Sequence, residues 1–107
     1  MIILNRQIDE PIVIGEKLRV SPTDVDTGGV RIHVCGEFVG GADDGLAVDR
    51  AYELAVGSSL RLGTLVNLTL MKVMLDAPKR AQFGIQVPPN MVVQRKEIVD
   101  RPAHEEE

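Results

Sequence analysis

The chain has no tryptophan, and aromatic residues make up only 3% of its 107 positions. A core without large rings has to be assembled from valine, isoleucine, leucine and methionine, and clusters of the β-branched residues favour strands. At this length, and with 44% hydrophobic residues, one compact domain can bury roughly two thirds of its unfolded surface. Two separate domains would each lack a sufficient core, so the sequence predicts a single domain.

Cysteine is nearly absent as well, since Cys35 is the single example. One thiol cannot close a disulfide within the chain, and the first ten residues, MIILNRQIDE, contain no basic leader followed by a long apolar stretch. The longest apolar stretch is interrupted at Asn67, Thr69 and Lys72, so it falls short of the roughly 18 apolar residues that a membrane-spanning helix needs. We therefore expect a cytoplasmic protein that does not enter the membrane.

The sequence also lacks the residue groupings that catalysis or metal binding requires. His33 has no second histidine, cysteine or carboxylate at ligand spacing. Neither His33 nor His104 can be assigned as a general base for Cys35. Asp43 and Asp44 are adjacent in a glycine-rich segment, which is typical of a solvated loop. The sequence thus predicts no enzyme, no metal site and no cofactor.

Charge is distributed unevenly along the chain, although the net charge is only −4. Residues 1–54 contain five Lys or Arg against ten Asp or Glu, whereas residues 55–102 contain seven against three. Glutamates occupy the last three positions. The net charge argues against a nucleic-acid partner, but a basic half is consistent with one, because lysine and arginine bind phosphates.

Short alternating stretches separated by turn residues recur throughout the sequence, a pattern that predicts an all-β fold. Residues 26–29, with two adjacent glycines, indicate a hairpin turn. Residues 36–45 indicate a loop, and residues 51–56 fit a strand, a helical turn or a connector equally well. The expected strands are residues 1–7, 11–14, 18–25, 30–34, 46–50, 59–63, 65–75, 81–85 and 91–95.

In the longest of these strands, residues 65–75, the alternation places Val66, Leu68, Leu70 and Lys72 on one face. After the last strand, residues 96–102 (KEIVDRP) predict a short C-terminal helix that stops at Pro102.

The order of elements repeats, which predicts two tandem units in one compact domain. The first unit spans residues 1–54, the second spans residues 57–101, and residues 102–107 form an acidic tail. Superposing the units aligns Gly15 with Gly63 and Arg50 with Arg95. The second unit has no clear counterpart of the opening strand MIILNRQ.

The opening MIILNRQIDEPIVIGEKLRV and the closing APKRAQFGIQVPPNMVVQRKEI together resemble the carbon storage regulator (Csr/Rsm) family of bacterial RNA-binding proteins. That family has an opening strand of the type M-L-I-L-x-R-R, an I-G turn, a long strand, a V-R-I-G-V strand and a final A-V-x-R-E-E-I strand running into a helix. The chain carries the pattern once in its first unit and again, without the opening strand, in its second. The resemblance implies two antiparallel sheets of interlocked strands, arranged as a single-chain pseudo-dimer.

Family members are interlocked homodimers in which the opening strand of one subunit lies beside the final strand of the other, and RNA binds across that pair. Their target is a GGA-containing single-stranded loop in an mRNA leader, and the bound protein represses translation. In this chain the resemblance implies one functional site, and the opposite site keeps only Arg50 as a remnant. The residues that match the functional site are Leu4, Arg6, Val93, Arg95 and Ile98.

Gln7 departs from the family pattern, because family members have a second arginine at this position of the opening strand. Together with the acidic first half and the acidic tail, this departure favours an alternative function. The protein would then keep the fold, have lost RNA binding, and act as a protein-interaction module or antagonist. In either case the fused chain is expected to be a monomeric pseudo-dimer or a homodimer.

Overall fold

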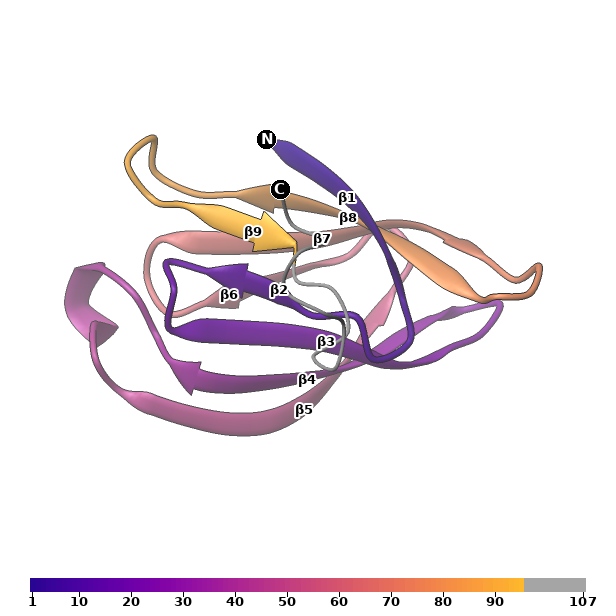
Figure 1. Cartoon of the computed structure of the whole chain (residues 1–107), viewed down its shortest axis with the longest axis horizontal. Helices are drawn as coiled ribbons and strands as arrows, with labels where there is room; N and C mark the ends of the chain where they lie inside the picture. The colour runs from indigo at the N-terminus through magenta and orange to yellow at the C-terminus, as the bar shows by residue number, and fades with distance from the viewer. Residues whose placement is uncertain (96–107) are drawn as a thin grey trace, which may run out of the picture.

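The computed structural model describes residues 1–95, and these residues form strands, turns and one short 3-10 helix, η1 (Gly41–Asp43) (Figure 1). The predicted C-terminal helix and Ile98 lie outside the described residues. The strands are β1 (Ile2–Gln7), β2 (Ile12–Ile14), β3 (Leu18–Val25), β4 (Gly29–Glu37), β5 (Ala47–Ala55), β6 (Ser59–Leu62), β7 (Val66–Met74), β8 (Arg80–Gln86) and β9 (Val93–Arg95).

The strands form two antiparallel sheets, which we name sheet A and sheet B. Sheet A has the order β1-β8-β7-β6, and sheet B has the order β5-β4-β3-β2-β9. The two predicted units interlock, because β1 of the first unit pairs with β8 of the second, and β9 of the second pairs with β2 of the first. The prediction of two antiparallel sheets of interlocked strands is confirmed.

The core lies between the sheets and is almost entirely aliphatic, as the composition predicted. Phe83 is the one fully buried aromatic side chain of residues 1–95, and Phe38 and Tyr52 pack against the core while partly buried. Period-two alternation along each strand turns every second side chain inward. Fully burying one valine, leucine or isoleucine side chain contributes about 2 kcal/mol to stability. The core therefore joins both units into one body.

The two units are related residue by residue through their strand pairings. β2, β3, β4 and β5 correspond to β6, β7, β8 and β1. The turn glycines Gly15 and Gly63 have similar positive φ angles, 62° and 72°, which favour glycine. Each long strand also carries an irregularity at the same point, where Thr23 in β3 and Met71 in β7 are skipped in the pairing register. The repeat thus extends to the backbone.

The position of β5 differs from the prediction that the second unit lacks an opening strand. β5 pairs with β4 as β1 pairs with β8, so β5 occupies the place of the missing opening strand, and residues 51–55 continue it. Sheet B has β9 beyond β2, whereas no strand of residues 1–95 flanks the corresponding β6. The first unit therefore lacks its final strand.

The predicted face of Lys72 is wrong, because a β-bulge lies at Met71. The bulge adds one residue to β7 and so reverses the alternation beyond it. Lys72 lies opposite Gln82 and is exposed, while Val73 lies opposite the buried Ala81. Lys72 therefore faces away from the core, unlike Val66, Leu68 and Leu70.

Candidate nucleic-acid interface

The predicted site combines the first and last strands, and the structure places them at edges of different sheets. β1 is the outer strand of sheet A and β9 is the outer strand of sheet B, so they are not hydrogen-bonded neighbours. A short turn leads from β1 to β2, which pairs with β9. Leu4 and Val93 both pack against the common core. The two strands are thus joined through one core rather than through a shared ladder.

Arg6 is buried, with 4% of its surface exposed. Its guanidinium donates hydrogen bonds to the carbonyl oxygens of Asn5 and Pro11, at 3.0 and 3.2 Å. It also lies 3.3 Å from Oε1 of Glu10, which accepts a hydrogen bond from the backbone N–H of Gln7. Arg6 therefore holds the turn after β1, and its charge is directed into the protein.

The closing strand contributes its backbone and Val93. In β9, Val93 lies opposite Ile14 of β2, and Arg95 lies opposite Ile12. The carbonyl oxygen of Val92 accepts a hydrogen bond from the N–H of Gly15 at 2.7 Å. These pairings anchor one side of β9 and leave its other side at the edge of sheet B.

Arg50 is not the counterpart of Arg95, contrary to the superposition made from the sequence. Arg50 lies opposite Val34 in the β4–β5 pairing, whereas β9 pairs with β2. The equivalent of Arg50 in the other unit is Ile2, which lies opposite Ile85. The Arg50 guanidinium lies 5.3 Å from the centroid of the Tyr52 ring, a cation–π arrangement. Arg50 therefore does not occupy, in its own unit, the position that Arg95 occupies in the other.

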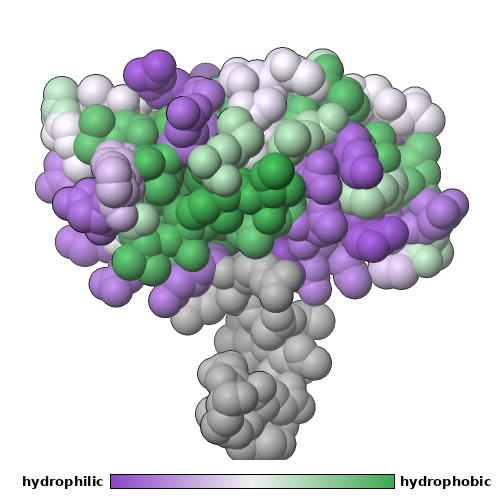
Figure 2. Space-filling model, turned by 90° about the horizontal axis from the view of Figure 1, so that it is seen from above, coloured by the Kyte–Doolittle hydropathy of each residue, from purple (hydrophilic) through white to green (hydrophobic). Residues whose placement is uncertain are grey.

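Exposed apolar residues begin the chain along β1. Met1, Ile2 and Ile3 are 69%, 38% and 52% exposed. Figure 2 views the side on which the chain begins, and apolar surface gathers near the middle of that side. An outer strand presents unpaired N–H and C=O groups, so β1 offers an incoming chain both main-chain hydrogen bonds and apolar contact.

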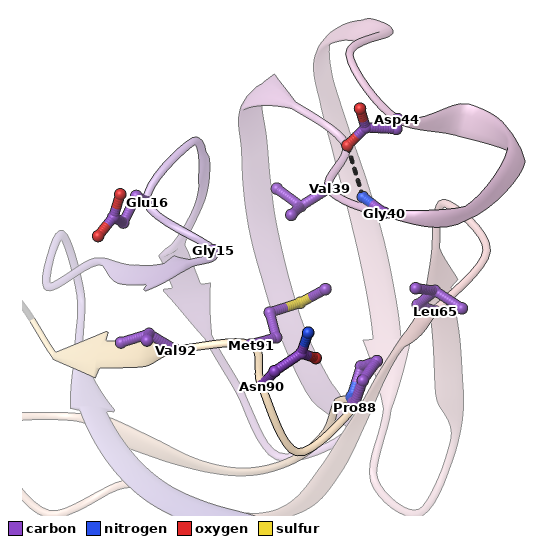
Figure 3. A pocket seen from close by; sticks show the side chains of 10 residues that line it. All are labelled: Gly15, Glu16, Val39, Gly40, Asp44, Leu65, Pro88, Asn90, Met91 and Val92. Atoms are coloured by element: carbon purple, nitrogen blue, oxygen red, sulfur yellow. Dashed lines mark hydrogen bonds between the residues drawn. The ribbon is translucent and has the colours of Figure 1, made fainter.

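A pocket of about 450 Å³ lies where four connections meet at one end of the sandwich (Figure 3). Val39, Leu65 and Met91 contribute apolar surface to it. Its charged groups are Glu16 and Asp44, and the Asp44 carboxylate accepts a hydrogen bond from the N–H of Gly40 at 2.7 Å. Among the residues that the structure describes, no lysine or arginine lines the pocket. Carboxylates repel phosphate, so this pocket is not suited to a nucleic-acid backbone.

Metal-binding clusters are absent from residues 1–95, where no three His, Cys, Asp or Glu side chains gather. His33 instead contacts the Asp49 carboxylate on the exposed face of sheet B. Over the same residues, no helix is long and apolar enough to cross a membrane.

The sequence prediction overlooked the outer face of sheet A, where Arg61 and Lys72 are exposed. The available signal was the absence of Asp and Glu from the expected strands 59–63, 65–75 and 81–85. It was missed because counting charge by halves of the chain does not separate the faces of a sheet.

Searches with family models, curated protein sequences and solved structures found no match to this chain.

Proposed function

We propose that the protein is a cytoplasmic RNA-binding regulator that binds GGA-type single-stranded loops in mRNA leaders and represses their translation, with one functional site per chain. The exchange of strands between the units supports this proposal. β1 completes the sheet of the second unit and β9 completes the sheet of the first, so the units interlock as the resemblance to the Csr/Rsm family implies, although β1 and β9 are not paired with each other. The site spans the exposed edges of these two strands.

Contact with RNA in this site is made mainly by the main chain. Looped-out bases expose their pairing edges, which N–H and C=O groups of an edge strand can read. Because Arg6 is buried and hydrogen-bonded within the chain, it positions the end of β1 and does not bind phosphate. Arg95 supplies the cationic contact in the proposal.

The decisive experiment is a fluorescence titration of the purified protein against a short RNA hairpin with GGA in its loop. The same hairpin with the triplet changed serves as the control. Preferential binding of the GGA hairpin at one RNA per chain supports the proposal. Equal affinity for both hairpins at moderate salt contradicts it.

The pocket at the end of the sandwich favours a second candidate function, a protein-interaction module or antagonist. Within the described part of the chain, the pocket has an apolar lining, the carboxylates of Glu16 and Asp44, and no cation, which suits an apolar side chain flanked by lysine or arginine. In this case the protein would show no GGA preference. Asp44→Asn would weaken the partner complex while keeping an oxygen that can accept the Gly40 hydrogen bond.

A further inference from the structure

The four strands of sheet A contain no aspartate or glutamate. Their outward side chains include three cations, Arg61, Lys72 and Arg80, placed on that face by strand pairing. By contrast, β3, β4 and β5 of sheet B together contain two aspartates and two glutamates. The positive character of the second half is therefore concentrated on one face.

The cations of sheet A are available to an incoming anion. Lys72 and Arg61 are exposed, and the Arg61 guanidinium donates a hydrogen bond to the carbonyl oxygen of Thr64 at 3.2 Å. Neither takes part in an ion pair within residues 1–95. The Nε atom of Arg80 is buried and has no hydrogen-bond partner in the same part of the chain. Arg61 and Lys72 thus carry uncompensated charge at the surface, while the unused Nε of Arg80 lies beneath it.

Uncharged hydrogen-bonding side chains lie beside these cations in two rows, separated by a strip in which Met1 and Met71 lie over Gly84. Asn5, Gln82 and Lys72 lie opposite one another across β1, β8 and β7. A second row consists of Gln86, Asn67 and Arg61 across β8, β7 and β6. Neighbouring strands are about 4.8 Å apart, so each row presents two amides and one cation across three strands. Amides can both donate to and accept from base edges.

The other unit provides an internal comparison. Through the strand registers, Lys72 corresponds to Asp24, and Asn5 corresponds to Glu53. On sheet B the carboxylates neutralise Arg31, which donates a hydrogen bond to Glu53. That bond, with the nearby negative charges, raises the pKa of Arg31. The two units share the same backbone arrangement but differ in surface charge. The face of sheet B is ion-paired, whereas the face of sheet A is positive and, within residues 1–95, has no ion pair at Arg61 or Lys72.

We propose that the outer face of sheet A is a second RNA-binding surface, which holds single-stranded RNA that flanks the loop bound at the edges of β1 and β9. This proposal rests on the proposed function and extends its site, because β1 belongs to both surfaces. Arg61, Lys72 and Arg80 neutralise phosphates. The amides contact bases that no longer pair.

The test compares a GGA hairpin with the same hairpin carrying a single-stranded tail of about ten nucleotides, a length within the range that one small domain covers. The wild-type chain should bind the tailed RNA at least about fivefold more tightly. The double variant Arg61→Gln/Lys72→Gln should lose this gain, and its log affinity should depend less steeply on log salt by about 1.4, because each single-strand phosphate contact accounts for about 0.7.

The matched control is Arg19→Gln/Arg31→Gln, which removes two exposed arginines from sheet B. It should keep the gain from the tail. Thermal unfolding of both variants checks that they are folded. The proposal is overturned if Arg61→Gln/Lys72→Gln still binds the tailed hairpin more tightly than the hairpin without a tail. It is also overturned if a polyglutamate peptide displaces the tailed RNA as effectively as unlabelled tailed RNA does, because the face would then bind acidic polymers in general.

The two proposals fail in distinguishable ways. If the wild-type chain ignores GGA but binds an unstructured RNA, and Arg61→Gln/Lys72→Gln loses that binding, the edge site is wrong and the sheet A surface is correct. If GGA is recognised but the tail adds no affinity, the edge site is correct and the sheet A surface is wrong.

Discussion

Arg6 and Leu54 occupy equivalent positions in the two units, opposite Ala81 and Val30, and both are buried. One unit thus uses a charged residue where the other uses an aliphatic one. The difference is explained by the turn after β1, where the Arg6 guanidinium donates to the Pro11 carbonyl oxygen and lies beside Glu10. The turn after β5 is held differently, because the backbone N–H and the hydroxyl of Ser58 both donate to the Ala55 carbonyl oxygen.

Arg6→Ala should therefore destabilise the fold by about 3 kcal/mol, since removing one partner leaves buried polar groups uncompensated. Chemical denaturation measures the change in the free energy of unfolding. Arg50→Ala is the control: its guanidinium is exposed and lies over Tyr52, so its loss should cost less than about 1 kcal/mol. Equal stability of the two variants would show that Arg6 has no special structural role.

Gly15→Ala should also destabilise the protein, by about 2 kcal/mol, because a Cβ atom would lie 2.7 Å from Cγ1 of Val39 and φ is 62°. Gly45→Ala isolates the conformational part of this cost. Gly45 has φ of 85°, but an added Cβ would meet no atom within 4 Å, so we expect about 1 kcal/mol from backbone strain alone. The same denaturation experiment compares both variants. A Gly15→Ala cost no larger than that of Gly45→Ala would contradict the close packing of Val39.

Arg95→Ala should lower the affinity for the GGA hairpin at least tenfold, which is about 1.4 kcal/mol of binding free energy. Arg50→Ala removes the same charge from β5, beside β4 rather than β2, and should leave the affinity within about twofold. Titration of both variants under one salt concentration makes the comparison, because RNA affinity depends steeply on salt. If Arg95→Ala binds as well as the wild type, the assignment of the edge site is wrong.

The difference between the two outer faces predicts a gain of function. Asp24→Lys/Glu53→Asn gives sheet B the residues found at the equivalent positions of sheet A. This variant should bind unstructured RNA more tightly than the wild type, and the increase should vanish at high salt. Asp9→Lys/Glu16→Asn makes the same changes in turns outside the sheets. An equal increase in that control would show that net charge, rather than the sheet face, is responsible.

Much of the local structure was predictable from the sequence. Alternation located the long strand that became β7, and paired glycines located the turn between β3 and β4. The repeat in the sequence aligns Gly15 with Gly63, and the two glycines have similar φ angles. These features depend on neighbouring residues alone, because side-chain direction in a strand and the backbone freedom of glycine are local properties.

The candidate site was less predictable, because its residues depend on contacts between distant segments. Arg6 matched the family pattern by position, but its burial follows from the turn that brings Pro11 against it. The order and lengths of the elements predicted Arg50 as the counterpart of Arg95, yet the two residues belong to opposite edges of sheet B.

The sequence by itself determined an all-β chain with two related units, an aliphatic core and one basic half. The tertiary structure alone decided which edge each strand joins, so that β5 fills the place of an opening strand and β6 has no neighbour other than β7 within residues 1–95. It also decided that a bulge at Met71 turns Lys72 outward. The physical reason is that alternation specifies two faces for every strand, whereas pairing and register, which choose the partner and the face that is buried, arise between residues far apart in the chain.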